Sequence, residues 1–253
     1  DFANEAGALP DLASIPFWYK QEGCAGVPAE FENRILYYES SRGCPFSCSY
    51  CLSSIDKRVR FRPMEMVKEE LDFFLSNKVK QVKFIDRTFN ANPTRALEIW
   101  SYLKEHDNGV TNFHFEIAAD IITEEELNCL ADMRSGQVQL EIGVQTTNPE
   151  TLCEIRRTTD MEKLCKNVAK LREFNNMHLH LDLIAGLPYE DMASFIRSFN
   201  EVYAMGGNDL QLGFLKVLHG SYMEEMRDVY GIICEEKEPY EVLSTNWISY
   251  EDV

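Results

Sequence analysis

Three cysteines, Cys44, Cys48 and Cys51, lie close together in this chain of 253 residues, whereas its other five cysteines are scattered. Thiolates bind zinc and iron–sulfur clusters, so a run of three predicts a metal centre. Structural zinc usually takes four ligands from paired Cys and His residues, and no second pair accompanies this run. A [4Fe–4S] cluster with one iron open to an exogenous ligand fits better, because an electron-carrier cluster normally has four cysteines. The alternative is three buried or incidental thiols.

The segment around these cysteines, residues 42–51, reads Arg-Gly-Cys-Pro-Phe-Ser-Cys-Ser-Tyr-Cys. It resembles the signature loop of the radical S-adenosylmethionine (SAM) superfamily, including the aromatic Tyr50 before the third cysteine. The resemblance implies that Cys44, Cys48 and Cys51 hold a [4Fe–4S] cluster whose open iron is chelated by SAM. It also implies reductive cleavage of SAM to methionine and a 5′-deoxyadenosyl radical. The remaining cysteines are expected to be core or surface thiols of a reducing cytoplasm: Cys24, Cys129, Cys153, Cys165 and Cys234.

Segments typical of strands and helices alternate between residues 34 and 231. Helices are expected to begin near Pro63 and Pro93 and at the capping-box sequence from Thr123 to Glu126. Alternating βα units imply a parallel sheet with right-handed crossovers and outer helices. Six units rather than eight predict an α/β fold, a partial (β/α)6 TIM barrel with its active site at the carboxyl ends of the strands, as in the radical SAM core. The predicted strands cover residues 35–38, 81–85, 113–117, 138–144, 179–185 and 210–217. The fifth predicted helix has the apolar pattern Phe195, Ile196, Phe199 and Val202, which it should bury. The sixth predicted helix covers residues 221–230 and is closed by Gly231.

The two flanks differ from this core in charge. Of the formal charge of −17, residues 1–33 carry −5 and residues 222–253 carry −7. Residues 1–33, which contain three prolines and little periodicity, are predicted to be a linker that wraps onto the core domain at 34–231. Within the linker, residues 12–16 resemble the connector that follows a cobalamin-binding domain in cobalamin-dependent radical SAM proteins. Residues 232–253 are predicted to be a C-terminal extension toward a missing domain.

Several predicted strands end in polar residues, and buried polar groups at such positions must be satisfied or functional. Gln145 is the last residue of a Gly-Val-Gln segment similar to that of oxygen-independent coproporphyrinogen oxidase, the methylthiotransferases and the Elongator catalytic subunit. Arg157 and Asp182 match the spacing of further residues in the oxidase. The resemblance implies that Gln145 and Asp182 bind the ribose hydroxyls of SAM, that Arg157 binds the methionyl carboxylate, and that Glu116 supports the methionyl end. Arg156 is an alternative to Arg157, and Glu141 is an alternative ribose ligand. Each predicted site residue could instead be a hydrogen-bonded carboxylate within the barrel or part of a surface ion pair.

The other predicted SAM contacts depend more on the resemblance. Asp86 occupies the position of the family's Gly-Gly-Glu segment, which binds the methionyl amine, but the glycines are absent and Asp86 could equally cap a turn. Adenine would be bound by the backbone at Tyr50, the side chain of Ile184 and the strand around residues 215–217. Lys216 could meet an anion or simply be solvated.

Four cations directly follow the cysteine loop: Lys57, Arg58, Arg60 and Arg62. They predict either docking of an acidic electron donor, of the flavodoxin or ferredoxin type, or placement of an anionic substrate. The alternative is a solvated loop paired with neighbouring acids. His178, His180 and His219 receive no role, because an isolated His is more often a packed or surface residue than a ligand.

Composition narrows the function classes. The chain is too apolar for disorder, and no apolar run approaches the length of a membrane span, so a cytoplasmic protein with no membrane partner is expected. The negative charge makes a small-molecule substrate more plausible than nucleic acid, but only mildly, because the core is nearly balanced. The sequence gives no prediction of the oligomeric state.

The leading hypothesis is a radical SAM enzyme that abstracts hydrogen from its substrate, within a cobalamin-dependent parent protein that catalyses a methylation or rearrangement. One alternative is a methylthiotransferase-like tRNA-modifying enzyme, which normally needs three further upstream cysteines, whereas only Cys24 precedes the loop. The other is a non-enzymatic metal or iron–sulfur sensor.

Overall fold

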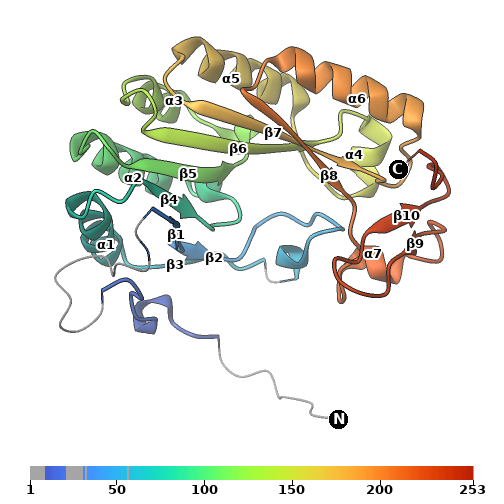
Figure 1. The fold of residues 1–253 in the computed structure, drawn as a ribbon, viewed down its shortest axis with the longest axis horizontal. Helices are drawn as coiled ribbons and strands as arrows, with labels where there is room; N and C mark the ends of the chain where they lie inside the picture. Colours follow the sequence, from blue (N-terminus) through green and yellow to red (C-terminus); the bar gives the residue numbers. More distant parts are fainter. Residues whose placement is uncertain (1–8, 21–30, 32, 56, 253) are drawn as a thin grey trace.

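A six-stranded parallel sheet forms the centre of the computed structural model, which describes residues 9–20, 31, 33–55 and 57–252 (Figure 1). Every neighbouring pair of its strands is parallel. In the described chain β1 and β8 are edges that do not pair with each other, so the sheet is an open, partial barrel, as predicted. In spatial order its strands are β1 (Ile35–Tyr38), β4 (Gln81–Phe84), β5 (Asn112–Ile117), β6 (Val138–Gln145), β7 (His178–Ala185) and β8 (Asp209–Phe214).

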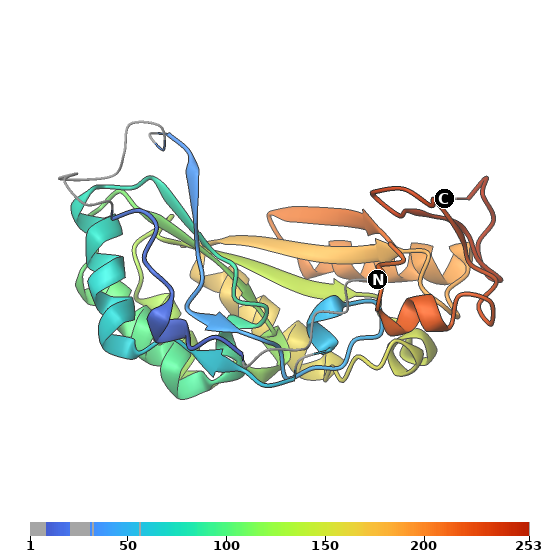
Figure 2. The same cartoon turned by 90° about the horizontal axis from the view of Figure 1, so that it is seen from below.

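Helices follow the strands and cover one face of the sheet (Figures 1 and 2). Asn92 and Thr123 cap α2 and α3, and the capping box predicted at Thr123 and Glu126 is present. One short helix, α4, was not predicted. The helices are α1 (Met64–Ser76), α2 (Pro93–Glu105), α3 (Glu124–Ala131), α4 (Pro149–Glu154), α5 (Met161–Phe174), α6 (Met192–Met205) and α7 (Tyr222–Glu225), with short 3₁₀ turns η1 (Leu12–Ser14), η3 (Leu52–Ser54), η4 (Phe89–Ala91) and η5 (Ala119–Ile121).

Two details of the predicted helices are wrong. On α6, Ile196 is 51% exposed and Phe199 is 36% exposed. Phe195 and Val202 are buried as expected, and Ser198, whose hydroxyl bonds to Glu190 at 3.0 Å, is buried on the same helix. The predicted sixth helix shrinks to the single turn α7, and residues 226–231 continue as turns, with the N–H of Arg227 bonded to the carbonyl of Glu224.

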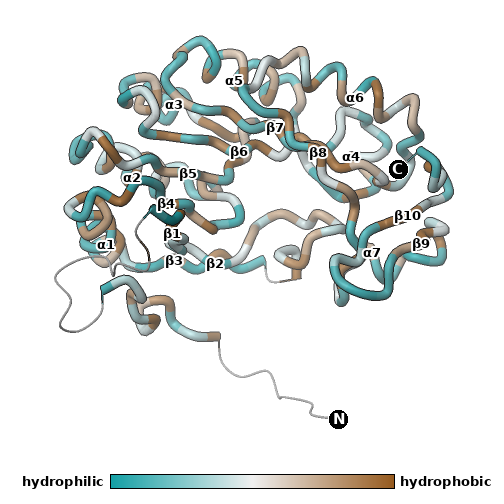
Figure 3. Tube along the Cα trace, viewed as in Figure 1, coloured by the Kyte–Doolittle hydropathy of each residue, from teal (hydrophilic) through white to brown (hydrophobic). Residues whose placement is uncertain are grey.

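Side chains alternate between two environments along the central strands. In β6 and β7 every second residue is buried under the helices, and the residues between them face the open side of the sheet. Aromatic side chains fill much of the core on the buried side, with the Phe84 and Phe115 ring centroids 4.6 Å apart. Figure 3 shows hydrophobic and hydrophilic stretches interspersed along the chain. The open side is therefore lined by polar residues that can bind ligands.

A second apolar cluster lies beside the carboxyl ends of β7 and β8. It joins Leu215 and Tyr230 to Ile232 and Val242, which follow residue 231. The hairpin of β9 (Ile233–Cys234) and β10 (Val242–Ser244) belongs to this end of the molecule (Figures 1 and 2). The predicted division at residue 231 therefore crosses a packed region, and the segment boundaries stay predictions.

Residues 9–20 pack along the opposite edge of the core. The Phe17 ring lies 5.3 Å from that of Phe74, and the buried Arg62 donates from Nη1 to the carbonyl of Leu12 at 2.6 Å. These contacts hold residues 9–20 against the core. Cys24 lies outside the described residues.

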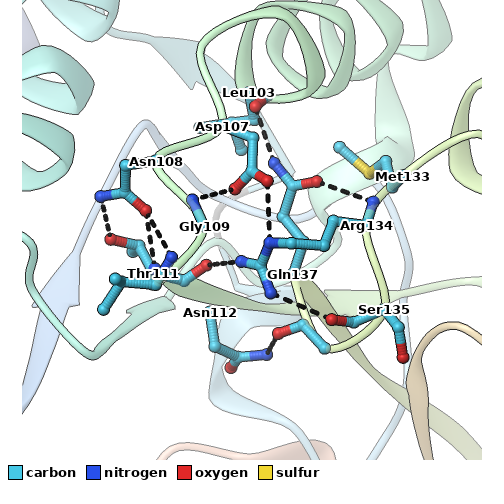
Figure 4. A network of polar contacts seen from close by, with 12 residues as sticks. Leu103, Asp107, Asn108, Gly109, Thr111, Asn112, Met133, Arg134, Ser135 and Gln137 are labelled. Atoms are coloured by element: carbon cyan, nitrogen blue, oxygen red, sulfur yellow. Dashed lines mark hydrogen bonds and ion pairs between the residues drawn. The ribbon is translucent and has the colours of Figure 1, made fainter.

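A polar network fixes the loops that enter β5 and β6 (Figure 4). Arg134 donates from Nε to Asp107 at 2.8 Å and from Nη2 to the carbonyl of Thr111 at 3.1 Å. The buried Gln137 donates to the carbonyl of Leu103 at 2.7 Å. These bonds fix where β5 and β6 begin, and hence where the polar residues at their other ends lie.

Candidate active site at the carboxyl ends of the strands

The cysteine loop is held in place at several points. The short antiparallel pair β2 (Ser41–Arg42) and β3 (Arg60–Phe61) closes its base, and Gly43 begins it with φ of 101°, a conformation that favours glycine. Within the loop, the backbone N–H of Ser49 donates to the carbonyl of Ile155 at 2.9 Å, and that of Met223 donates to Ser49 at 3.1 Å. The loop is therefore anchored to α4 and α7, which come much later in the chain.

All three thiols of the loop are free. Cys44 and Cys48 are buried and Cys51 is partly exposed. The Sγ atom of Cys44 lies 3.6 Å from the hydroxyl of Thr88. Free, sheltered thiols are the form in which cysteine can bind a metal cluster.

A cavity of about 130 Å³ opens beside Cys48 at the ends of the central strands. Four of the predicted SAM-binding side chains line it together: Glu116, Gln145, Arg157 and Asp182. Glu141, the competing ribose ligand, lines it as well. The complete lining is Phe46, Cys48, Arg87, Thr88, Glu116, Ile117, Ala118, Asp120, Glu141, Gly143, Gln145, Arg157, Thr158, Thr159 and Asp182.

Arg157 connects the cavity to the cysteine loop. Its Nη1 atom lies 3.7 Å from Cys48 Sγ and 3.4 Å from the Tyr50 hydroxyl, and its Nη2 atom donates to the carbonyl of Gly143. Its buried Nε has no hydrogen-bond partner. Arg156 instead stacks on the Tyr222 ring, 3.5 Å from the centroid. Of the two alternatives, only Arg157 faces the cavity.

Gln145 and Asp182 present unpartnered oxygens. The pairing of β6 with β7 shifts register between Gly143 and Gln145, and Gln145 adopts φ of 73°, unusual for a residue other than glycine. Oε1 of Gln145 and Oδ1 of Asp182 are buried without a partner. Burial, and then the nearby Glu141 and Glu116, raise the pKa of Asp182 to about 7. Both oxygens are free to accept hydrogen bonds from a ligand.

The Glu141 carboxylate already interacts with other side chains of the protein. Its Oε2 atom accepts from Lys83 at 2.8 Å and faces His114 Nε2 at 2.9 Å. The close approach of His114 is the main reason that the pKa of Glu141 falls to about 2. Glu116 is less constrained, with Lys83 Nζ at 3.9 Å, and burial raises its pKa. Glu116 is therefore more available to a ligand than Glu141.

Asp86 lies apart from the cavity lining. It is 1% exposed and accepts from the backbone N–H and hydroxyl of Ser40, at 3.0 and 2.7 Å, and from the hydroxyl of Ser41 at 2.5 Å. Its carboxylate oxygens are therefore occupied by residues that lead into the cysteine loop, which favours a structural role over SAM binding, although these partners are not those of a local turn cap.

Tyr50 and Ile184, the two predicted adenine contacts, pack against the second apolar cluster rather than in the cavity lining. Within that cluster are the buried side chains of Leu215 and Val217, whereas Lys216 is exposed. An apolar surface thus lies next to the Arg157 side of the cavity.

Several cavity residues were missed by the sequence analysis, notably Arg87, Thr88, Asp120, Thr158 and Thr159. Arg87 and Thr88 directly follow Asp86, and the two threonines directly follow Arg157. Their positions next to predicted site residues in the sequence could have suggested them. The sequence does not show which of them face the cavity, because that depends on the conformations of the loops.

The basic run after the cysteine loop is partly structural. Arg62 is buried and forms an ion pair with Glu70 at 2.5 Å. Arg60 donates to the carbonyl of Pro10 at 3.0 Å. These two cations therefore support the alternative of internal pairing, while Lys57 and Arg58 are exposed.

The donor set fits the cofactors implied by the sequence. Three free thiols lie on one loop, as a cluster with one open iron requires. The unpartnered Nε of Arg157 and the unpartnered oxygens of Gln145 and Asp182 complement the carboxylate and hydroxyl groups of SAM. Among the described residues, no helix combines the length and apolarity needed to cross a membrane.

The curated relatives and solved structures include several radical SAM proteins. The "Cobalamin-dependent radical SAM methyltransferase TokK" of Streptomyces tokunonensis is 25% identical over 252 residues, covering 93% of this chain and 36% of TokK. The "Ribosomal protein uS12 methylthiotransferase RimO" of Protochlamydia amoebophila is 24% identical over 201 residues, covering 76% of this chain and 39% of RimO. The chain thus spans little more than a third of either relative.

Among solved structures, the radical S-adenosylmethionine methyltransferase TsrM of Kitasatospora setae, with cobalamin and a [4Fe–4S] cluster bound, is similar in fold. The TM-score is 0.69 at 16% identity, over 82% of this chain and 40% of TsrM. A model described as "Protein of unknown function (DUF4080)" matches residues 228–253. The model of the radical SAM superfamily matches residues 38–202, more than half of the chain. The chain therefore belongs to the radical SAM superfamily.

Proposed function

We propose that Cys44, Cys48 and Cys51 hold a [4Fe–4S] cluster and that the chain cleaves SAM reductively. The observation that carries the proposal is the position of Arg157, between Cys48 and a cavity that contains unpartnered polar atoms of Gln145 and Asp182. When bound, the cluster supplies the electron that splits SAM into methionine and a 5′-deoxyadenosyl radical, which abstracts hydrogen from the substrate.

The residues of the cavity would orient SAM at its two ends. Arg157 would bind the methionyl carboxylate, because a guanidinium forms parallel hydrogen bonds to a carboxylate. Gln145 and Asp182 would accept from the ribose hydroxyls, and Glu116 would face the methionyl amine. The apolar surface at Ile184 and the backbone at Tyr50 would flank adenine.

For the parent protein we propose methyl transfer with cobalamin bound by a domain outside this chain, and a small-molecule substrate. Two similar proteins support this assignment: TokK is a cobalamin-dependent methyltransferase, and TsrM is a methyltransferase whose structure contains cobalamin. A flavodoxin- or ferredoxin-type protein would supply the electron. Purification of the parent protein with bound cobalamin, seen by its visible absorption, would test the cobalamin step.

The second candidate is a methylthiotransferase, favoured by the match to RimO. Such an enzyme would carry an auxiliary cluster held by further cysteines. Iron analysis of the reconstituted parent protein separates the two candidates: a single cluster gives about four irons per chain, and an added auxiliary cluster gives about eight. Membership of an enzyme superfamily argues against the sensor alternative.

The central test is anaerobic reconstitution of this chain followed by incubation with dithionite and SAM. We expect about four irons per chain and the formation of 5′-deoxyadenosine, measured by chromatography and mass spectrometry. Cys48→Ala should abolish the product, whereas Cys153→Ala, which alters an exposed free thiol, should not. Turnover by Cys48→Ala would contradict the proposal.

A further inference from the structure

Two histidines and an aspartate converge at the amino ends of β7 and β8, on the polar side of the sheet. His178 and His180 are alternate residues of β7 and so project from the same face, and Asp209, the first residue of β8, pairs with His180 in the strand register. Both imidazoles face the same carboxylate oxygen: His178 Nε2 lies 2.7 Å and His180 Nδ1 lies 3.5 Å from Asp209 Oδ2.

We propose that His178, His180 and Asp209 form a binding site for a divalent transition-metal ion of the zinc class. One donor atom from each residue lies within 4.8 Å of the other two, and no other trio of His, Cys, Asp or Glu in the described part of the chain meets this condition. Imidazole nitrogen and carboxylate oxygen are the ligands that such ions take in proteins.

The spacing of the donor atoms suits a metal ion. With metal–ligand distances of about 2.0–2.1 Å, neighbouring ligands of a tetrahedral zinc ion lie about 3.3 Å apart. The two nitrogen-to-oxygen distances, 2.7 and 3.5 Å, bracket this value. Small rotations of the three side chains would therefore complete the site, with the remaining position open to water.

The surroundings of His180 can hold its ring in a ligating orientation. Nε2 of Gln139 lies 2.5 Å from Nε2 of His180. Rotating the Gln139 amide by half a turn puts its oxygen there, where it accepts the N–H of a metal-bound imidazole, an arrangement typical of metal-ligating histidines. His114 stacks nearly parallel to His180, at 5.7 Å between ring centroids, but its own Nε2 faces Glu141. His114 is thus a support and not a fourth ligand.

The site is separate from the proposed SAM cavity. His178 and Asp209 begin their strands, whereas Gln145 ends β6, and none of the three proposed ligands lines that cavity. The side chains of His178, His180 and Asp209 are 44%, 18% and 56% exposed, so an ion can enter without opening the core. A bound ion would tie the edge strand β8 to β7 and so stabilise the open end of the sheet.

Calorimetric titration of Zn²⁺ into the full chain tests the site, with the cluster first reconstituted anaerobically so that its cysteines are occupied. We expect one equivalent of Zn²⁺ to bind with a Kd below about 100 µM. His178→Ala, His180→Ala and Asp209→Asn should each weaken binding at least about tenfold, because each removes one of three ligands. The matched control is His219→Ala, which removes an exposed histidine paired with Glu224 at 2.6 Å and should leave binding unchanged.

Zinc-edge X-ray absorption gives a second readout that does not depend on the variants. A first shell of nitrogen and oxygen alone supports the site, whereas sulfur at about 2.3 Å would assign the bound zinc to thiolates and overturn it. The proposal also fails if Zn²⁺ binds more weakly than the stated limit, or if the double variant His178→Ala/His180→Ala binds as tightly as the unaltered chain. None of these results depends on SAM cleavage.

Discussion

Arg157 Nη1 lies 3.7 Å from the Sγ atom of Cys48, although 109 residues separate the two in sequence. The Arg157 guanidinium can therefore donate to the sulfur atom that is proposed to bind the cluster. The same side chain lines the cavity and keeps Nε without a partner. Arg157 therefore joins the proposed cluster site to the proposed SAM site.

Arg157→Ala should weaken SAM binding by about 10–100-fold, which corresponds to the loss of one charge-assisted hydrogen-bonded pair. The measurement is equilibrium binding of SAM to the reconstituted chain, with iron content determined in parallel. Arg156→Ala is the matched control, because Arg156 stacks on Tyr222 outside the cavity. Equal losses in the two variants would refute the assignment of Arg157.

SAM binding should strengthen as pH rises from 6 to 8, because the pKa of Asp182 is raised to about 7 and only its ionised form accepts from both ribose hydroxyls. Asp182→Asn should remove this dependence. Binding measured across this range checks both statements, and a pH dependence that persists in Asp182→Asn would contradict them.

Asp182 also affects folding in a pH-dependent way. Its raised pKa favours the protonated folded form, so its contribution to stability is full below pH about 4 and is lost as pH rises through about 7. Asp182→Asn should therefore match the unaltered chain at low pH and exceed its unfolding free energy by about 1–2 kcal/mol at pH 8, allowing for screening by solvent. Denaturant unfolding at the two pH values measures this difference. A constant offset at both would show that Asp182 is not the titrating group.

Gly143→Ala should impair the cavity without unfolding the protein. The added Cβ would collide with the amide nitrogen of Gln145, the movable end of a side chain, and displace it from the cavity. We expect SAM affinity to fall about as far as in Gln145→Ala, by roughly tenfold. At Gly213, an added Cβ meets its nearest atom, the carbonyl oxygen of Leu183, at an ordinary 3.5 Å, so Gly213→Ala is the control and should bind SAM normally.

The buried pair of Arg62 and Glu70 should contribute strongly to stability. Their side chains are 6% and 7% exposed, so Arg62→Ala would leave an unpaired buried carboxylate and cost about 3–5 kcal/mol of unfolding free energy. Lys68→Ala breaks an exposed pair with Glu98 and should cost about 0–1 kcal/mol. Denaturant unfolding compares the two; similar costs would mean that Arg62 is better solvated than its burial indicates.

Much of the fold was predictable because the spacing of apolar residues along the sequence indicates strands and helices. In β1, for example, the predicted and observed ranges coincide. The position of Arg157 was predictable only through its spacing from Gln145. The exposed face of α6 could not be predicted, because the hydrogen bond that buries Ser198 joins it to Glu190, which lies outside the helix. The contact between His178 and Asp209 could not be predicted either. These residues are 31 positions apart, and their contact depends on the register between β7 and β8.

Electron paramagnetic resonance of the dithionite-reduced chain, recorded with and without SAM, tests the central claim most directly. If three cysteines leave one iron open and Arg157, Gln145 and Asp182 bind SAM beside it, addition of SAM must change the spectrum of the reduced cluster. A spectrum that SAM leaves unchanged would contradict the account.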